Sequence, residues 1–248
     1  MSLAELVTRT EKETVPLHMQ TATIFGDYGT GKTSIAAGNP LALYYDLEDS
    51  AVEHEVDKFP AARTWAEFTS TLTEIWKGDT SLDGRTIVID TVTDLWRLCE
   101  RHSLASRGLE QMPRDDYGRT LKETRDDFEL YFNMLLMLRT KRRMGTVFIA
   151  HEDVEEIETE THTIRNYRPK VQDKHIRMLI SAKPQMVLRT FKADEHPITL
   201  KPFPNPPQFL VAAKPLTAHI CVKDRSNKLP ALVAASWEAL EKAYNKEK

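Results

Sequence analysis

The sequence is poor in the residues and segments that define several large classes of protein. It has two cysteines, Cys99 and Cys221, in 248 residues, so no disulfide framework is expected and a reducing compartment is the simpler interpretation. No apolar run approaches the roughly 20 residues of a membrane span, and residues 1–16 lack the apolar core and cleavage site of a signal peptide. Internal repeats and low-complexity tracts are absent as well. These absences favour one large globular domain in the cytoplasm, without a membrane partner.

The charges are distributed unevenly along the chain. Residues 1–161 carry 18 Lys and Arg against 30 Asp and Glu, whereas residues 162–248 carry 16 against 7. The basic C-terminal third is either a surface for a polyanion or the electrostatic partner of the acidic part, in the same molecule or in a neighbouring one. The sequence leaves these alternatives open.

Hydrophobic patterning predicts strands that alternate with helices. A segment at 18–25 that alternates and is rich in β-forming residues is expected to be a strand, as are the apolar or β-branched runs at 41–49, 85–91 and 145–151. Helices are expected from residue 33 and over 64–76, 92–107 and 117–143. Thr64 and Glu67 have the spacing of a capping box at the start of the second helix. The alternation predicts an α/β fold with a mostly parallel central sheet flanked by helices.

The chain changes character after residue 151. Residues 152–175 are polar and poor in apolar side chains, which predicts a loop or a mobile hairpin. Short strand-like segments then follow at 185–191, 197–203, 208–213 and 217–223, and they predict antiparallel hairpins at one edge of the sheet. A closing helix is expected over 231–244.

Glycine is scarce, yet three of the nine glycines stand in the stretch TIFGDYGTGKTSIA at 23–36. The spacing Gly26-x-x-x-x-Gly31-Lys32-Thr33 is the pattern of a P-loop, which holds the phosphates of a nucleoside triphosphate on backbone N–H groups. Lys32 is expected to reach the β- and γ-phosphates and Thr33 to hold Mg²⁺. The residues expected to bind ATP are Gly26, Asp27, Tyr28, Gly29, Thr30, Gly31, Lys32, Thr33 and Ser34.

Two carboxylates at the ends of predicted strands are candidates for the chemistry. Asp90 ends the apolar run IVID and is expected to bind Mg²⁺, although an Asp after a strand is also a common helix N-cap. Thr91 occupies the position where many ATPases have the glutamate that orients the attacking water. Glu48, in the stretch YYDLE at the end of the preceding strand, is therefore the expected catalytic base, with a solvated loop carboxylate as the alternative.

His151 ends the predicted strand GTVFIAH. In a P-loop sheet with an extra central strand, this strand lies between the P-loop strand and the strand of Asp90, so that His151 would face the γ-phosphate. A histidine there can hydrogen-bond phosphate or water and pass the signal to the following loop. The alternative is a buried histidine with a backbone partner.

The order of the motifs, from the P-loop through YYDLE and IVIDT to VFIAH, resembles the RecA-like ATPases. It is most similar to phage-type members known as AAA ATPases or Sak-type recombinases, over about residues 17–225. The resemblance implies a RecA-like P-loop fold, with an N-terminal segment at 1–16, an ATPase core at 17–230 and a C-terminal helix and tail at 231–248. It also supports Glu48, since the catalytic glutamate of RecA follows an Asp and one further residue, and His151, which phage-type members tend to have where others have Gln.

The resemblance further implies contacts beyond ATP. In RecA the loop after the sensor strand binds single-stranded DNA, and its counterpart at 152–175 has basic residues Arg165, Arg168, Lys170 and Lys174, although its first half is acidic and departs from the pattern. Lys223 and Arg225 resemble the K-x-R element of KaiC- and RadA-like members. That element reaches the γ-phosphate of a neighbouring subunit, which implies a ring or filament.

The function that the resemblance implies is a Mg²⁺-dependent ATPase of phage-type DNA recombination. It would bind single-stranded DNA as a homo-oligomer and promote annealing or strand exchange in the cytoplasm of a bacterial host, with a single-strand-binding or annealing protein as a further partner. Three alternatives stay open: a ring motor or helicase loader, a small-molecule kinase with an arginine-rich lid at 100–130, and a nucleotide-dependent scaffold.

Overall fold

A single twisted sheet forms the centre of the computed structural model, which describes residues 14–246 except 79, 159–162, 206 and 217–220. Most of the N-terminal segment expected at 1–16 thus lies outside the described residues. The strands are β1 (Thr21–Gly26), β2 (Ala42–Asp46), β3 (Asp57–Lys58), β4 (Thr86–Asp90), β5 (Gly145–Glu158), β6 (Thr163–Pro169), β7 (Met186–Ala193), β8 (Gln208–Ala212), β9 (Lys223–Asp224) and β10 (Leu232–Ala234).

The helices connect and cover these strands. They are α1 (Lys32–Ala37), α2 (Trp65–Lys77), α3 (Val92–Ala105), α4 (Arg119–Arg142), α5 (Lys174–Ala182) and α6 (Trp237–Asn245), with short 3₁₀ turns at Leu17–Met19 and Thr80–Leu82. The predicted capping box is confirmed, because the Thr64 hydroxyl accepts a hydrogen bond from the Glu67 amide and the Glu67 carboxylate accepts one from the Thr64 amide.

The strand order is β10-β8-β7-β1-β5-β4-β2-β3, and the pairs from β7 through β3 are all parallel. The predicted α/β fold with a mostly parallel sheet is therefore confirmed. The expected insertion of the 145–151 strand between the strand of the P-loop and the strand of Asp90 is also confirmed. Helical crossovers are what parallel neighbours require, and the alternation of strands and helices along the chain supplies them.

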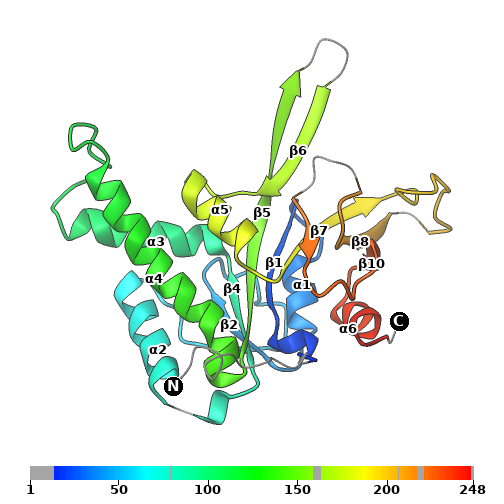
Figure 1. Ribbon diagram of the computed structural model, residues 1–248, viewed down its shortest axis with the longest axis horizontal. Helices are drawn as coiled ribbons and strands as arrows, with labels where there is room; N and C mark the ends of the chain where they lie inside the picture. Colours follow the sequence, from blue (N-terminus) through cyan, green and yellow to red (C-terminus); the bar gives the residue numbers. More distant parts are fainter. Residues whose placement is uncertain (1–13, 79, 159–162, 206, 217–220, 247–248) are drawn as a thin grey trace, which may run out of the picture.

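Side chains that alternate along each strand divide the core into two layers. Phe25, Tyr45 and Phe148 face a layer covered by α2, α3, α4 and α5, whereas their neighbours Ile24 and Tyr44 face a layer covered by α1 and α6. Figure 1 shows α1 and α6 on one side of the central strands and the longer helices on the other. Because both faces are buried, β2 and the first half of β5 are continuous apolar runs rather than alternating ones.

The predicted antiparallel pairing of the segments at 185–191 and 208–213 is confirmed, because β7 pairs antiparallel with β8. The sequence does not predict the other side of β7, which pairs in parallel with β1 inside the sheet, and the burial of Met186, Val187 and Leu188 matches that position. The antiparallel strands at this end are β8, β9 and β10. Among the described residues, 197–203 contribute only one isolated bridge, and the expected strand at 217–223 is represented by β9 alone, since 217–220 lie outside the described residues.

The closing helix begins later than the sequence predicts. Residues 232–234 form β10, and α6 starts after Ser236, whose hydroxyl accepts a hydrogen bond from the Ala239 amide. Trp237 and Tyr244 of this helix are buried in the same layer as α1. The C-terminal helix is thus packed against the core that contains the P-loop strand.

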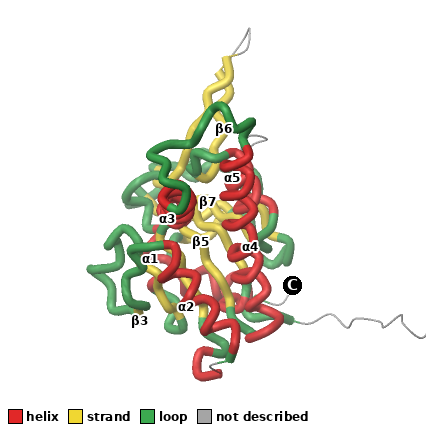
Figure 2. Tube along the Cα trace, turned by 90° about the vertical axis from the view of Figure 1, so that its left-hand side faces the viewer, coloured by secondary structure: helices red, strands yellow, loops and turns green. Residues whose placement is uncertain are grey.

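Residues 152–175 are largely ordered as a hairpin. β5 continues past the sheet to Glu158 and pairs with β6 over seven positions, and the two strands project from the body as an arm (Figures 1 and 2). The chain then enters α5, a helix that the sequence analysis misses. Asp173 caps it by accepting hydrogen bonds from the amides of His175 and Ile176.

Candidate functional site

The parallel register brings the predicted site residues to one edge of the sheet. Gly26 at the end of β1 lies opposite His151 of β5 and Thr190 of β7, and Asp46 at the end of β2 lies opposite Asp90 of β4. The carboxyl ends of parallel strands are where open α/β sheets bind ligands. The P-loop, both carboxylates and the histidine therefore belong to one site.

The glycines of the P-loop are required by the backbone. Gly29 and Gly31 have φ angles of 64° and 85°, a region that other residues rarely adopt. Gly26 has a different reason, because a Cβ there would lie 2.2 Å from the Thr190 hydroxyl oxygen and 2.3 Å from the Thr190 carbonyl oxygen. The Thr190 hydroxyl is also 2.7 Å from the Thr30 hydroxyl, so β7 directly supports the loop.

Lys32 is buried and folded onto its own loop. Its ammonium donates a hydrogen bond to the Asp27 carbonyl at 2.8 Å, which is a neutral partner that a phosphate oxygen can replace. Burial lowers the pKa of Lys32, and the surrounding carboxylates Asp90, Asp27, Glu48 and Glu152 oppose that shift. The Lys32 ammonium thus lies near four carboxylates, at the place where a P-loop lysine meets the phosphates.

A hydroxyl–carboxylate set suited to Mg²⁺ lies beside the lysine. The hydroxyls of Thr33 and Ser50 both donate to Oδ2 of Asp90, at 2.8 and 2.7 Å. Asp90 is 1% exposed, and burial raises its pKa. Hard oxygen donors of this type are what Mg²⁺ prefers, so the residues fit the expected ion. Ser50 is a member that the sequence analysis misses, because it precedes Asp90 by forty residues and belongs to no motif.

Among the described residues, no three His, Cys, Asp or Glu side chains gather as a metal cluster. A P-loop site needs none, since it holds Mg²⁺ with one hydroxyl, one carboxylate and the phosphates of the nucleotide.

Glu48 and His151 contact each other at the same edge. The two oxygens of the Glu48 carboxylate lie 3.3 and 3.2 Å from Nε2 of His151, and the Thr91 hydroxyl donates to the same carboxylate at 3.0 Å. Hydrogen bonds, first with His151 and then with Asp94 and Thr91, lower the pKa of Glu48 to about 2 against the opposing effect of burial. Tyr28 of the P-loop stacks on the imidazole, with ring centroids 4.2 Å apart. The predicted base and the predicted sensor therefore form one unit with the phosphate loop.

Asp46 has a structural role instead. Its carboxylate pairs with Lys58 at 2.7 Å and accepts hydrogen bonds from the amides of Ser50 and Ala51. These contacts shape the turn that presents Glu48 and Ser50 to the site.

β7 contributes two cations that the sequence analysis misses. Arg189 forms a buried ion pair with Glu152, the residue after His151, and its guanidinium lies 3.7 Å from the Tyr167 ring centroid. Lys192 extends beside the P-loop, where its ammonium lies 3.6 Å from the position that a Cβ on Gly29 would take. Neither residue stands in a recognisable motif. Their proximity to the P-loop comes from the parallel pairing of β7 with β1.

Lys223 and Arg225 lie at the opposite end of the sheet. β9 pairs with the first residues of β7. The Lys223 and Arg225 side chains both donate to the carbonyl of Ala182, which precedes β7, at 2.5 and 2.6 Å. Burial, and then the neighbouring guanidinium, lowers the pKa of Lys223 to about 8. Both side chains point away from the phosphate loop of their own chain, so a role at a γ-phosphate requires a second copy.

The four cations predicted to bind DNA are divided between two environments. Arg165 pairs with Glu156, and Arg168 pairs with both Asp153 and Glu155 across the arm. Lys170 and Lys174 are exposed and form no ion pair with any described residue. Part of the basic C-terminal third therefore neutralises acidic residues of the same molecule, as one of the two alternatives for the charge asymmetry states.

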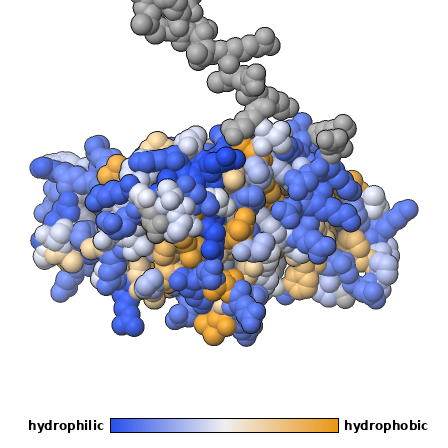
Figure 3. All heavy atoms as spheres, turned by 90° about the horizontal axis from the view of Figure 1, so that it is seen from below, coloured by the Kyte–Doolittle hydropathy of each residue, from blue (hydrophilic) through white to orange (hydrophobic). Residues whose placement is uncertain are grey.

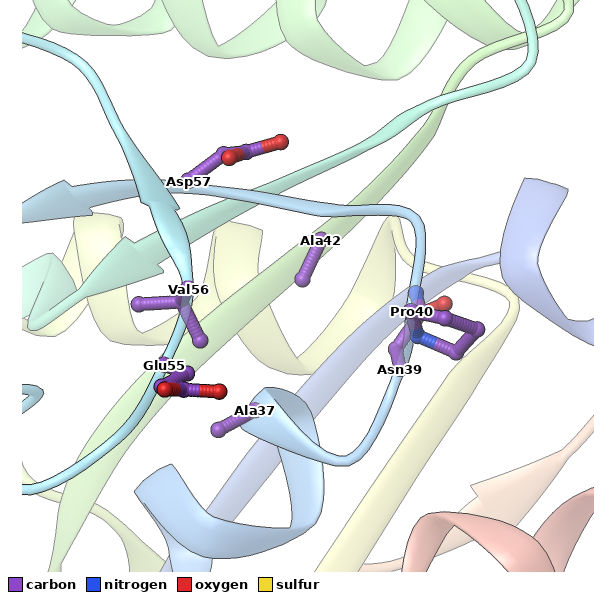
Figure 4. Close-up of a pocket in the computed structure, with 7 residues that line it drawn as sticks. All are labelled: Ala37, Asn39, Pro40, Ala42, Glu55, Val56 and Asp57. Carbon is purple, nitrogen blue, oxygen red and sulfur yellow. The ribbon is translucent and has the colours of Figure 1, made fainter.

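Two cavities among the described residues are distinct from the phosphate loop. One of about 440 Å³, at the start of β2, is lined by Ala37, Asn39, Pro40, Ala42, Glu55, Val56 and Asp57 (Figure 4). It contains neither a P-loop residue nor Glu48. A second, of about 330 Å³, includes Asp46 and Asp94 and adjoins the Glu48 carboxylate.

Comparison with known proteins agrees with this geometry. A family model described as an AAA domain matches residues 18–194, more than two thirds of the chain, and the match includes the P-loop, Glu48, Asp90 and His151. The chain belongs to this family and is a P-loop ATPase. No curated protein matches it. In the part of the chain that the structure describes, no helix has both the length and the apolar character needed to span a membrane.

The contact with His151 generates a first prediction. Replacing His151 by Ala removes the main cause of the low Glu48 pKa, so the pKa should rise from about 2 towards the ordinary value of 4.5. The titration of the Glu48 side-chain carboxyl carbon, followed by NMR, measures it. Tyr28→Leu is the matched control, because it removes the stacked ring and leaves the imidazole, and it should keep the low value. An unchanged Glu48 pKa in His151→Ala would contradict the assignment.

Proposed function

We propose that this member of the AAA-domain family is a Mg²⁺-dependent ATP hydrolase that binds single-stranded DNA as an oligomer and acts in DNA recombination, by annealing or strand exchange. The observation that carries the hydrolase part is the placement of Glu48. Its carboxylate is held by His151 and Thr91 and lies close enough to Asp90 and Lys32 to affect the pKa of each. A catalytic base for hydrolysis has to lie beside the phosphate loop and the metal ligands, as this carboxylate does.

The roles in hydrolysis follow from the environments. Glu48 is ionised above a pH of about 2, so its carboxylate is available to accept a hydrogen bond from the attacking water and orient it. Lys32 stabilises the negative charge that develops on the β- and γ-phosphate oxygens. Thr33, Asp90 and Ser50 would hold Mg²⁺, which neutralises phosphate charge. His151 touches both the base and Tyr28, and it is placed to respond to the γ-phosphate.

The oligomeric part of the proposal is supported by the K-x-R pair. Lys223 and Arg225 lie at the end of the sheet remote from the P-loop. Cations at one end and a phosphate site at the other suit a head-to-tail arrangement, in which each copy completes the site of the next.

The DNA part is supported by the resemblance to phage-type recombinases and by Lys170 and Lys174, two cations that form no ion pair with a described residue. Lys170 donates its amide to the His151 carbonyl at 2.7 Å, so the backbone between the sensor and the base of the arm is continuous. DNA held by Lys170 and Lys174 would therefore be one hydrogen bond from the nucleotide sensor.

Glu48→Gln tests the assignment of the base. We expect kcat for ATP hydrolysis to fall by about 10²-fold or more, because the amide is a weaker acceptor for the water proton, while ATP binding stays nearly unchanged. Steady-state phosphate release and equilibrium binding of ATP measure the two effects. Asp49→Asn is the matched control, since it changes the adjacent, exposed carboxylate and should keep full activity. Wild-type turnover in Glu48→Gln would show that another group is the base.

Complementation tests the oligomer. Arg225→Ala and Glu48→Gln should each be nearly inactive, because one lacks the cation and the other lacks the base. Mixed assemblies contain sites with Glu48 from one copy and Arg225 from the next, so mixing the two inactive variants should restore part of the ATPase activity. No recovery in demonstrably mixed assemblies, or full activity of Arg225→Ala, would contradict a role in trans.

Salt-dependent binding of an oligothymidylate tests the DNA surface. The double variant Lys170→Ala, Lys174→Ala should weaken binding and reduce the slope of log affinity against log salt by about 1.4, at roughly 0.7 per cation. Arg165→Ala, Arg168→Ala is the control, with a smaller effect because acidic residues already neutralise these arginines. ATP hydrolysis measured with and without the oligonucleotide reports the coupling, and hydrolysis indifferent to DNA at low salt would contradict this part.

A further inference from the structure

Three cations gather at the end of the sheet remote from the P-loop, where β1 and β7 begin and α4 ends. Arg139 of the last turn of α4, Arg225 after β9 and Lys228 in the following turn line a cavity of about 210 Å³ there. The neutral groups around it include Gln20, Gln185 and Tyr244. Figure 3 views the molecule from this side, and hydrophilic residues cover most of the face.

No described carboxylate lines this cavity or pairs with its cations. Arg139 and Lys228 donate no side-chain hydrogen bond to a described residue, and Lys228 instead lies over the Tyr244 ring at 4.2 Å. The guanidinium of Arg225 donates to the Ala182 carbonyl. Asp224, which precedes Arg225, has its oxygens occupied by the amides of Ser226 and Leu229.

Elsewhere the same chain supplies partners for its partly buried arginines. Arg142, one turn after Arg139 on α4, pairs with Asp83, and Arg125 and Arg189 pair with Asp173 and Glu152. Three cations around one small cavity repel one another, and this cost persists unless an anion enters or water screens the charges. Among the described residues, the lack of a carboxylate at three cations is the distinguishing feature of this cavity.

We propose that this cavity binds a phosphate group. Two guanidinium groups and an ammonium are the donors that recognise tetrahedral phosphate oxygens, and Gln185 adds a further polar side chain. The Gln20 amide donates to the Tyr244 hydroxyl and both donate to the Val15 carbonyl, so these two groups form the wall of the cavity. The volume suits a phosphate but is below the roughly 300 Å³ or more of sites that enclose a whole drug-sized ligand. The phosphate is either the free ion or one phosphodiester of a nucleic-acid backbone. The proposal does not depend on ATP hydrolysis, but it shares Arg225 with the proposed function, so the variants below change Arg139, Lys228 and Gln185 and leave Arg225 in place.

The test uses protein saturated with Mg²⁺ and ADP, so that the P-loop is filled. Thermal unfolding is followed as inorganic phosphate is added, with chloride at equal ionic strength as the reference. Phosphate should raise Tm, and the double variant Arg139→Gln, Lys228→Gln should require at least about tenfold more phosphate for the same rise, since two charge-assisted contacts are lost. Lys242→Gln is the matched control, because it removes an exposed charge from α6 outside the cavity, and it should respond as the wild type does.

A second variant guards against simple misfolding. Gln185→Glu places a carboxylate among the three cations, so it should raise Tm without phosphate and reduce the response to phosphate. A merely damaged protein would lose stability instead.

An oligothymidylate without terminal phosphates separates the two sources. Dependence of its affinity on Arg139 and Lys228, without a response to inorganic phosphate, would identify a phosphodiester as the ligand, whereas a response to the free ion alone would identify phosphate itself. If the double variant, Gln185→Glu and the wild type respond equally to both probes, the cavity is not a phosphate site and the proposal is overturned.

Discussion

The parallel pairing of β5 between β1 and β4 is the contact on which the site depends. Each strand position is fixed by hydrogen bonds to both neighbours, so the end of β5 can only lie beside the ends of β1 and β4. This register places His151 opposite Gly26, and the turn after β2 then brings Glu48 to the imidazole. A shift of one residue would turn His151 to the other face of the sheet and would separate it from Glu48.

The same edge shows how neighbouring carboxylates acquire different properties. Asp90 is buried among hydroxyls, and burial raises its pKa, whereas the contact with His151 lowers the pKa of Glu48. Environments that separate the pKa values of two acids are a common basis for a division of roles. Here the Asp90 carboxylate accepts hydrogen bonds from two hydroxyls, whereas the Glu48 carboxylate contacts His151.

β5 also gives the site a direct connection to the rest of the molecule. The strand that carries His151 continues without interruption into the arm, and the next residue, Glu152, is tied to Arg189 of β7, whose guanidinium lies on Tyr167 of β6. His151 is therefore joined to the arm by the continuous strand β5 rather than by a loop. The charge of the arm is mainly satisfied within it, and cations that form no ion pair with a described residue lie at its base and at the far end of the sheet.

The sequence by itself determined the parts of this protein that depend on local spacing. The P-loop pattern, the capping box at Thr64, the buried strands and the identities of Glu48, Asp90 and His151 as candidates could all be predicted, because each is a short motif or an apolar run with one structural outcome. The tertiary structure alone decided what long-range pairing brings together. It placed β7 inside the sheet, recruited Ser50 to Asp90, tied Arg165 and Arg168 to the acidic strand of the arm, and gathered Arg139, Arg225 and Lys228 around one cavity. These residues are far apart in the chain or stand in no motif, and their contacts follow from the register of the strands and the packing of helices against them, which local patterns do not specify.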